Sequence, residues 1–493
     1  MMRSMYAAVS GLSAHQMKMD IIGNNIANVN TVAFKGSRVT FKETFNQTVK
    51  GASGAEGGRG GTNPVQIGLG VDVGAIDVVH TRGSLERTDR ATDLMINGEG
   101  FFMVSDDANA LNRYYTRAGN FLVDGGGNLV TQDGFKVLGY MADETGRLKT
   151  SIEGLKIDFS AVYPPQATRP SDPPIEGEEI VTITGNLDSR TKELNKLDST
   201  AKVIATGADK GIYNFNQARS KAAGHPIYTQ ENDALKPALG GTTSVKVYDD
   251  FGNIHEINLI FAKKSSTAGD DPKSTWEVHA FYKDDDGAML IDGQTNTSYT
   301  DGKASNGSNG FKGKPITLEF DKNGNVVGDS KMPFTIGTDL TAGAAALSFE
   351  MDLSKLTQFS GKTNAAATTI KGYPQGKLDG YSISPSGEIV GAFSNGQGRV
   401  LGRIGLTNFS NPAGLQKTQS NMFIKTRNSG EPVVGMPGAG GFAQLNPGNL
   451  EMSNVNMARE FTNMITTQRG FQANSKIIST TDEMLQELVN IKR

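Results

Sequence analysis

Apolar residues repeat with a helical period at the N-terminal end of the chain. Counting from Met1 in alternating steps of four and three residues gives Met1, Met5, Ala8, Leu12, His15, Met19, Ile22, Ile26 and Val29. All of these except His15 are apolar. This heptad spacing is typical of a helix that packs against another helix. Gly11 and Gly23 lie inside the predicted helix, where each costs about 1 kcal/mol relative to alanine.

The C-terminal end repeats this pattern. An apolar residue recurs at every seventh position, namely Leu450, Met457, Met464, Phe471, Ile478 and Leu485. A helix that packs in this way also has a second set of positions, each four residues after one of these, and this second set is less apolar. Phe461 and Val489 are apolar there, whereas Asn454, Gln468, Ser475 and Asp482 are polar. We therefore predict a second long helix at this end of the chain.

Two arrangements of the terminal helices are compatible with these patterns. Both helices could dock on a globular body, or they could pair with each other and with the same helices of neighbouring subunits. In the second case the residues predicted to pack between subunits are Met5, Leu12, Met19, Ile22, Ile26, Met457, Phe461, Met464, Phe471, Ile478 and Leu485.

The middle of the chain predicts β structure. Alternating or β-rich segments flank short turn motifs at 120–130, 245–262, 276–291, 316–327 and 381–390, which is the chemistry of β-hairpins. Apolar residues alternate with polar or neutral ones at Ile257, Leu259 and Phe261, and again at Trp276, Val278, Ala280 and Tyr282.

Glycine-rich and proline-rich stretches divide the chain into modules. Residues 50–62 and 435–448 are rich in glycine and predict flexible connections. Proline clusters at 163–174 and 371–376 mark the entry and exit of a central insertion. We predict a multidomain α+β protein of three modules: residues 1–75 with 435–493, a discontinuous β-rich domain of 76–162 with 373–434, and a β-rich insertion of one or two subdomains at 163–372.

Composition and charge exclude several classes of protein. The net charge is −3 and the charges are interspersed, so we expect no binding to nucleic acid. The absence of cysteine excludes disulfides, thiolate metal sites and a cysteine nucleophile. No run of 18 apolar residues occurs, so we expect no membrane insertion. The first 20 residues lack the apolar core of a secretory signal, and we expect them to be retained.

Catalytic and metal-binding motifs are poor. The glycine fragment at 97–102 does not complete a phosphate-binding loop. Residues 321–332 begin like a calcium loop, but Val326 replaces the turn glycine and Met332 the bidentate glutamate, so a hairpin turn is favoured. The five histidines lack metal-ligand spacing. We expect no enzyme, no cofactor and no metal site.

Asparagine is frequent where the first predicted helix ends, in "GNNIANVNTVAFKGSR" at 23–38. These side chains compete for backbone hydrogen bonds and favour caps and turns, so we expect a helix stop that is also read by neighbouring subunits. The stretch resembles a signature of the rod and hook proteins of the bacterial flagellum. The matching residues are Asn24, Asn25, Ala27, Asn28, Thr31, Phe34 and Lys35. Ala33 stands where that family usually has glycine.

Other segments carry the same resemblance. Residues 450–493 are similar to the closing segment of the family, and 93–104, 115–121 and 391–402 to its middle landmarks. The chain length, with "FKGSR" and "LVNIKR", favours the hook branch over the shorter rod proteins. The resemblance implies a coiled-coil-like inner module of both terminal helices, a discontinuous mainly-β middle module, and outer β modules.

The resemblance also implies a function. The chain would be a structural subunit that self-assembles into a helical tube, a flexible joint that transmits torque from rod to filament. The implied partners are copies of itself, the distal rod protein, the hook cap, the hook–filament junction proteins and the flagellar type III export apparatus. The implied location is extracellular, in the flagellum, reached without a cleaved signal peptide.

Three questions stay open at this point. Phe41 and Phe45, four residues apart, resemble a hydrophobic export motif of such substrates, but both could simply pack in a strand or helix. The chain could instead be a rod-type axial protein with an enlarged outer domain. It could also be a secreted β-rich enzyme or adhesin with coiled termini.

Overall fold

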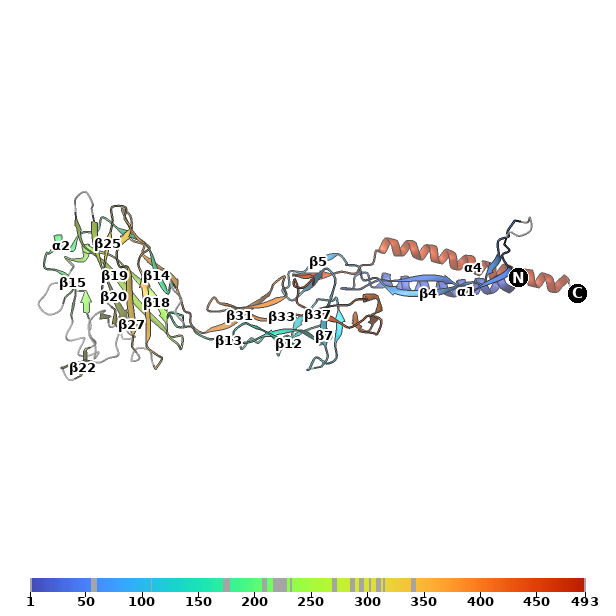
Figure 1. The fold of residues 1–493 in the computed structure, drawn as a ribbon, viewed down its shortest axis with the longest axis horizontal. Helices are drawn as coiled ribbons and strands as arrows, with labels where there is room; N and C mark the ends of the chain where they lie inside the picture. Colours follow the sequence, from blue (N-terminus) through green and yellow to red (C-terminus); the bar gives the residue numbers. More distant parts are fainter. Residues whose placement is uncertain are drawn as a thin grey trace. The chain divides into compact units, whose positions relative to one another are not determined.

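The computed structural model divides the chain into two compact units. Unit 1 comprises residues 1–160, 378–392 and 398–493, and unit 2 comprises 161–377 and 393–397. The structure describes residues 2–54, 60–107, 109–171, 178–205, 211–215, 228–230, 233–267, 273–283, 289–291, 297–300, 303–306, 312–313, 315–337 and 343–491. The chain is mostly β with a long helix at each end, as the α+β prediction requires (Figure 1). The boundaries of the three modules stay a prediction.

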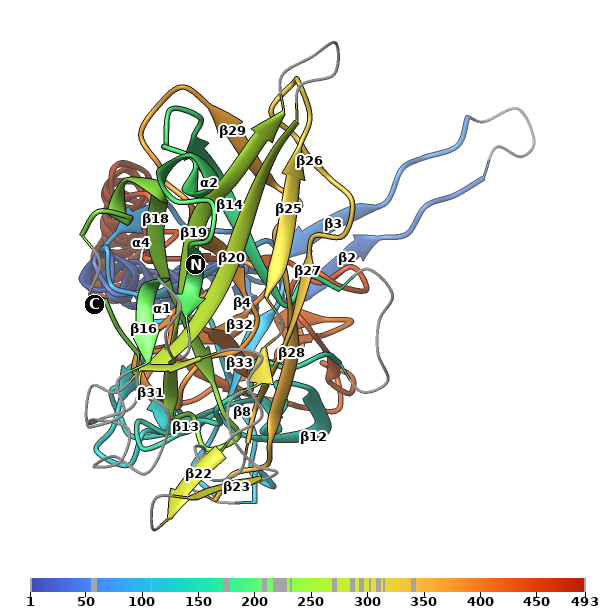
Figure 2. The same cartoon turned by 90° about the vertical axis from the view of Figure 1, so that its left-hand side faces the viewer.

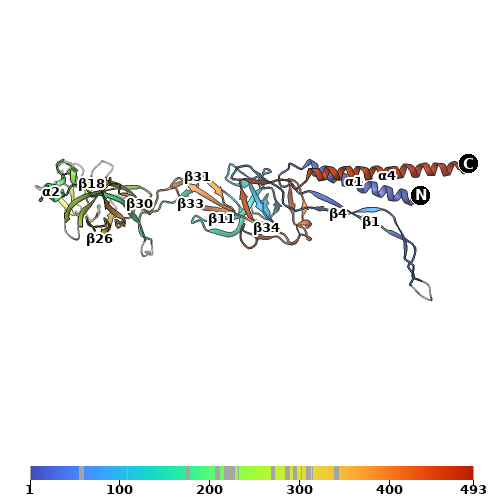
Figure 3. The same cartoon turned by 90° about the horizontal axis from the view of Figure 1, so that it is seen from above.

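The terminal helices α1 (Met2–Ala27) and α4 (Met457–Ile491) pack against each other in unit 1 (Figure 1). They run antiparallel, because the facing residues keep a constant sum: Gly11 faces Asn474, His15 faces Gly470, and Asn25 faces Glu460. In this register Met2 lies opposite Glu483. The last turns of α4 therefore extend beyond the first turn of α1 (Figure 3).

The helix glycines allow this close approach. A Cβ atom at Gly11 would lie 2.7 Å from Nδ2 of Asn474, and one at Gly470 would lie 2.8 Å from the His15 ring. The propensity cost of a helical glycine is thus offset by tighter packing of the pair. No described helix is long and apolar enough to cross a bilayer.

A two-stranded ribbon follows α1. Strands β1 (Ser37–Glu43) and β4 (Val71–Val78) pair antiparallel, and Figure 3 shows them beside the helices. Further out, β2 (Asn46–Lys50) pairs with β3 (Val65–Gly68). These strands flank the predicted connection at 50–62, of which residues 55–59 lie outside the described residues.

The remainder of unit 1 is β structure contributed by two distant segments. The first supplies β5 (Leu85–Arg87), β6 (Leu94–Asn97), β7 (Phe101–Ser105), β8 (Tyr114–Thr116), β9 (Leu122–Val123), β10 (Leu129–Val130), β11 (Lys136–Ala142) and β12 (Leu148–Gly154). The second supplies β31 (Gly376–Ile383), whose first two residues belong to unit 2, β32 (Glu388–Phe393), β33 (Gly398–Ile404), β34 (Leu406–Asn408), η2 (Pro412–Gly414), β35 (Gln416–Lys417), β36 (Met422–Ile424), β37 (Val433–Gly435), β38 (Gln444–Pro447) and β39 (Asn449–Glu451).

Strands of the two segments pair with each other. β33 pairs with β11, β34 with β7, and β36 with β8. The core between them contains Phe101, Met103, Tyr115, Leu138 and Phe423. The predicted hairpins at 120–130 and 381–390 thus contribute strands to one sheet system.

The glycine-rich stretch at 435–448 is held against this β structure. β38 pairs with β6, the Leu445 side chain is fully buried, and Arg403 donates to the Pro437 carbonyl at 2.9 Å. Gly438, Gly440, Gly441 and Gly448 have positive φ, so they serve turns that other residues would strain. The flexibility expected of this stretch from its composition is reduced by these contacts.

Unit 2 is a β structure of stacked sheets. Its strands are β13 (Val162–Tyr163), β14 (Val181–Asp188), β15 (Lys202–Ala205), β16 (Gly211–Phe215), β17 (Tyr228–Gln230), β18 (Leu239–Tyr248), β19 (Ile254–Thr267), β20 (Lys273–Lys283), β21 (Met289–Ile291), β22 (Thr297–Thr300), β23 (Lys303–Asn306), β24 (Lys312–Gly313), β25 (Ile316–Phe320), β26 (Val326–Val327), β27 (Lys331–Ile336), β28 (Leu347–Asp352), β29 (Leu356–Phe359) and β30 (Ala366–Ile370), with short helical turns α2 (Leu194–Leu197) and η1 (Lys236–Ala238).

Two six-stranded sheets enclose the core of unit 2. One follows the order β18-β19-β20-β25-β26 and the other β24-β27-β28-β14-β29, with β21 and β30 added (Figure 2). The residues predicted to face the core do so, since Ile257, Leu259, Phe261, Trp276, Val278 and Ala280 are fully buried and Tyr282 nearly so. The intervening Ile260, Ala262 and Phe281 are buried as well, in a second apolar cluster. The calcium-like loop is a hairpin turn, because Asp321 accepts backbone N–H bonds from Asn323 and Asn325 between β25 and β26.

Candidate functional site

The asparagine motif ends helix α1 by hydrogen bonding to the chain itself. Asn28 donates from Nδ2 to the Asn24 carbonyl at 2.9 Å and to Asn24 Oδ1 at 2.8 Å. Thr31 donates from its hydroxyl to Asn28 Oδ1 at 3.1 Å. These bonds satisfy groups that the last helical turn leaves free, which confirms the predicted helix stop.

Asn25 links three elements of the same chain. Its side chain is nearly fully buried and donates to the Ser37 carbonyl at 2.8 Å and to Glu460 of α4 at 3.3 Å. Its Oδ1 accepts the Ser37 N–H at 3.0 Å. This asparagine therefore fixes the end of α1 to β1 and α4 within one subunit, so its amide is not left free for a neighbour.

The motif residues Ala33 and Phe34 lie in a buried turn. Ala33 has a φ of +56° and donates its N–H to the Glu451 carbonyl at 2.7 Å. The backbone is left-handed there, which explains why glycine suits this position. The Phe34 ring is buried and lies 4.0 Å from Nζ of Lys417, a cation–π contact.

A buried ion cluster centres on Glu451. Lys35 Nζ lies 2.6 Å from Glu451 Oε1, and Arg117 lies 3.5 Å from Oε2. Burial lowers the pKa of Lys35 and of Arg117, and Glu451 opposes the shift for both. Further hydrogen bonds satisfy the cations, from Lys35 to the Thr81 carbonyl and from Arg117 to the Gly98 carbonyl.

His80 lies next to this cluster. Its ring packs against Phe101 and Phe423. Burial, together with the charges of Lys35 and Arg117, lowers the pKa of His80 to about 4. The imidazole is therefore neutral at pH 7.

Asn454 completes the junction between the two ends of the chain. Its Oδ1 accepts the Gly36 N–H at 2.8 Å, and its Nδ2 donates to the Val79 carbonyl at 2.7 Å. The sequence pattern predicts no function for Glu451, Arg117 or His80, and it places Asn454 only at a weak position of the C-terminal helix repeat. The available signal was a glutamate and an asparagine just before a long helix, but their partners lie far away in sequence.

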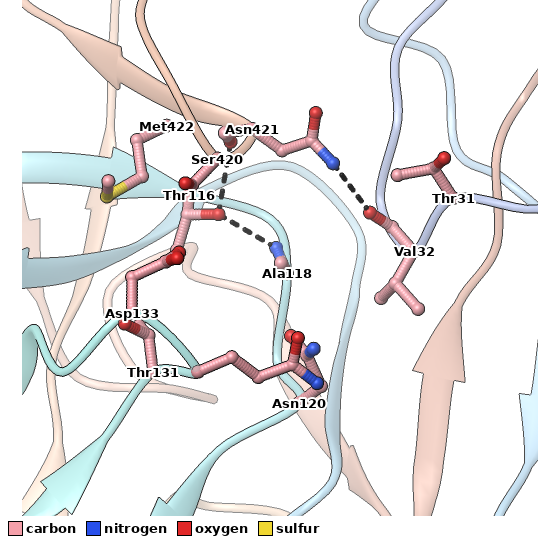
Figure 4. A pocket seen from close by; sticks show the side chains of 11 residues that line it. Thr31, Val32, Thr116, Ala118, Asn120, Thr131, Asp133, Ser420, Asn421 and Met422 are labelled. Carbon is pink, nitrogen blue, oxygen red and sulfur yellow. Dashed lines mark hydrogen bonds between the residues drawn. The ribbon is translucent and has the colours of Figure 1, made fainter. Parts of the chain in front are cut away.

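A cavity of about 340 Å³ adjoins the motif loop in unit 1 (Figure 4). Polar side chains dominate its lining, including Thr31, Thr116, Asn120 and Asp133. Asn421 closes one side by donating to the Val32 carbonyl at 3.1 Å. Among the described residues no group of three or more histidine, aspartate or glutamate side chains could hold a metal ion.

The packing residues predicted on the helices fall into two sets. Those that are buried or half-buried are Met5, Leu12, Met19, Ile22, Ile26, Met464, Phe471, Ile478 and Leu485. Met457 and Phe461 are 43% and 48% exposed. In the structure, Thr467, Asn474 and Thr481 of α4 face α1. Each lies one position before a residue of the second set predicted from the sequence, so α4 packs small polar side chains against α1.

Three apolar stripes remain exposed on the helices. The α1 stripe consists of Met2, Tyr6, Val9 and Met17. The proximal α4 stripe consists of Met457, Phe461 and Ile465, and the distal α4 stripe of Ile477, Met484, Leu488 and Ile491. Steps of three, four and seven or eight residues place the members of each stripe on one side of its helix.

The two phenylalanines of the proposed export motif have different surroundings. Phe41 lies in β1, where its ring is 5.8 Å from the His15 ring and Lys18 Nζ lies 5.7 Å from its centroid. Phe45 follows β1 and is 73% exposed. Neither residue is in a helix, so a helical i,i+4 pair is not their arrangement.

Family models match four segments of the chain. They are described as flagella basal body rod protein (residues 5–35), flagellar hook protein FlgE/F/G D1 domain (95–170), flagellar basal body protein FlaE D2 domain (215–373), and flagellar basal body rod FlgEFG protein C-terminal (446–491).

Full-length relatives match as well. The chain is 35% identical to flagellar hook protein FlgE of Borreliella burgdorferi, covering 100% of both chains. It is 32% identical to flagellar hook protein FlgE of Treponema pallidum, again over 100% of both. A solved structure, flagellar hook protein FlgE2 of Helicobacter pylori, matches at 17% identity and a TM-score of 0.40, covering 73% of this chain and 99% of that one.

Proposed function

The chain belongs to the flagellar hook protein family and is a structural subunit of the flagellar hook, and we propose that the three exposed stripes of α1 and α4 build its polymer. The observation that carries this proposal is the exposure of large apolar side chains on helices whose other faces already pack together. Contiguous apolar exposure of this kind marks a protein interaction surface.

The free energy available from these stripes is adequate for assembly. Full burial of a methionine, phenylalanine or isoleucine side chain contributes roughly 1.5–3 kcal/mol, so burial of the exposed half contributes about 1 kcal/mol. The stripes contain eleven large apolar side chains, counted from their members above. They supply on the order of 10 kcal/mol per subunit before the entropic cost of association is subtracted.

The geometry of the helix pair favours an open polymer. The last turns of α4 extend beyond α1, so they can reach helices of a second copy and not their own partner. A contact between two different surfaces of identical subunits repeats indefinitely unless the rotation closes, and the product is then a helical filament. We infer a coiled-coil-like inner module, a discontinuous middle module and an outer module, with the boundaries given from the sequence.

The proposed role is mechanical and not enzymatic. The assembled tube would act as a flexible joint that transmits torque from rod to filament. The inner helices would hold constant packing, whereas polar turns such as that of Asp321 could exchange contacts with water at small cost. The proposed partners are copies of the chain, the distal rod protein, the hook cap, the hook–filament junction proteins and the type III export apparatus, with export to the cell exterior without a cleaved signal.

Assembly of a surface variant tests the proposal. Phe461→Ser places a polar group in the proximal α4 stripe, and Phe251→Ser is the matched control at a 63% exposed position of unit 2. We expect Phe461→Ser to raise the critical concentration for polymerisation at least tenfold while the helical circular dichroism of the monomer is unchanged. The control should polymerise like the parent chain. The reverse order of effects would contradict the proposal.

A further inference from the structure

Methionine is concentrated on the surfaces proposed to assemble. Among side chains whose exposure is described, the methionines more than a third exposed are Met2, Met17, Met457 and Met484. All four lie on α1 or α4, and each of the three stripes contains at least one. By contrast Met95, Met103, Met332, Met351 and Met422 are at most 2% exposed in the β cores.

We propose that these four methionines form a peroxide-sensitive modification site that controls assembly reversibly. Each thioether sulfur attacks one oxygen of hydrogen peroxide, the O–O bond breaks, and the products are a methionine sulfoxide and water. The sulfur loses two electrons to the peroxide. The chain contains no cysteine, so no thiol competes within it, and the exposed thioethers are its most readily oxidised side chains.

The surroundings of each sulfur determine the consequence. Met457 shares its stripe with Phe461 and Ile465, and Met484 shares its stripe with Ile477, Leu488 and Ile491. A sulfoxide is polar and accepts hydrogen bonds, so burying it among apolar side chains once water is excluded costs free energy. Oxidised subunits should therefore fail to pack, whereas subunits already packed should be shielded from peroxide. This inference rests on the assembly surface proposed above.

The test uses the full chain as monomer and as polymer. Hydrogen peroxide is applied at pH 7 and removed with catalase, and sulfoxides are mapped by peptide mass spectrometry. We expect the four methionines to oxidise at least ten times faster than those of the β cores in the monomer. In the polymer their oxidation should slow at least tenfold. Oxidised monomer should lose polymerisation, and methionine sulfoxide reductase with dithiothreitol should restore it.

A variant with all four residues replaced by leucine separates the sites from general damage. It should polymerise and stay competent after peroxide. The control is Met141→Leu, at a half-buried position of β11, and this variant should remain sensitive. If the four-leucine variant fails to assemble, the parent chain provides the test. Its loss of assembly must then proceed at the same rate as oxidation of the four methionines, and the reductase must restore assembly. Oxidised parent chain that polymerises normally would overturn the inference. Failure of untreated parent chain to polymerise would instead overturn the proposed function.

Discussion

Lys35 and Glu451, 416 positions apart in the chain, form an ion pair of 2.6 Å from which water is excluded. Lys35 follows the turn after α1, and Glu451 ends the last strand before α4. Arg117 of the β structure approaches the same carboxylate. One glutamate thus joins both terminal segments to the β structure of unit 1.

Removal of one partner should destabilise this junction strongly. Lys35→Met leaves the buried Glu451 carboxylate with the Gly83 N–H at 2.9 Å and the more distant Arg117, and loss of one partner of a buried pair costs about 3 kcal/mol or more. We expect the free energy of unfolding to fall by that amount when urea denaturation is followed by the helical circular dichroism signal, which reports α1 and α4.

The chain offers a matched control and an internal one. Lys42 and Asp72 form an ion pair of 3.7 Å whose side chains are both 60% exposed, so Lys42→Met should cost less than about 0.5 kcal/mol. Trp276 lies in unit 2, so its fluorescence should report an unchanged transition. Equal effects of both lysine variants would contradict the assignment.

Ala33→Gly should stabilise the same region. A left-handed conformation costs a non-glycine residue about 1–2 kcal/mol. Glycine removes this cost, but its greater conformational freedom in the unfolded chain offsets part of the stability gained. We expect a net gain of about 0.5–1 kcal/mol in the free energy of unfolding. Ala473→Gly, at an exposed position inside α4, should instead lose about 1 kcal/mol. A loss at both positions would show that Ala33 is not strained.

Acid should weaken the junction through His80. The pKa of His80 is lowered to about 4 by burial and by Lys35 and Arg117, against an ordinary value of 6.5. Between these two values the unfolded chain binds a proton that the folded chain does not, so stability falls as the pH decreases from about 6.5 to 4. His80→Phe should flatten this part of the stability curve of unit 1. An NMR titration of the His80 ring near pH 6.5 would contradict the prediction.

Phe45→Ala should separate export from folding. Phe45 is 73% exposed, whereas Phe41 contacts α1 through His15. If the pair acts in export, Phe45→Ala should reduce the secreted fraction while leaving the thermal unfolding of the monomer unchanged. Ile67→Ala, exposed in the neighbouring strand β3, is the control. Normal secretion of Phe45→Ala would contradict the export role and would indicate that Phe41 and Phe45 serve only in packing.

The helices and hairpins follow from local pattern, whereas the junction does not. The heptad of 1–29 and the turn chemistry of Asp321 are local, so α1 and the β25–β26 turn could be predicted. The ion cluster joins Lys35, Arg117 and Glu451 across hundreds of residues, and nothing in the spacing of a single sequence pairs such charges. Thr467 and Thr481 were missed for a related reason, because small polar residues in a tight helix seam resemble solvent-facing ones.

The last prediction concerns bending, and it uses the backbone pairing at the two ends of the insertion in unit 2. Gln166 and Tyr373 are bridged by reciprocal backbone hydrogen bonds of 3.0 Å, so residues 167–372 can be replaced by a short glycine linker with little strain. The chain that remains keeps α1, α4 and their stripes. We expect it to polymerise, with altered curvature and stiffness, because the contacts that unit 2 is proposed to make between subunits would be absent. Electron microscopy of the polymers measures both properties. Curvature and stiffness equal to those of the parent polymer would mean that the insertion takes no part in bending, and the proposed flexibility would then have to come from unit 1.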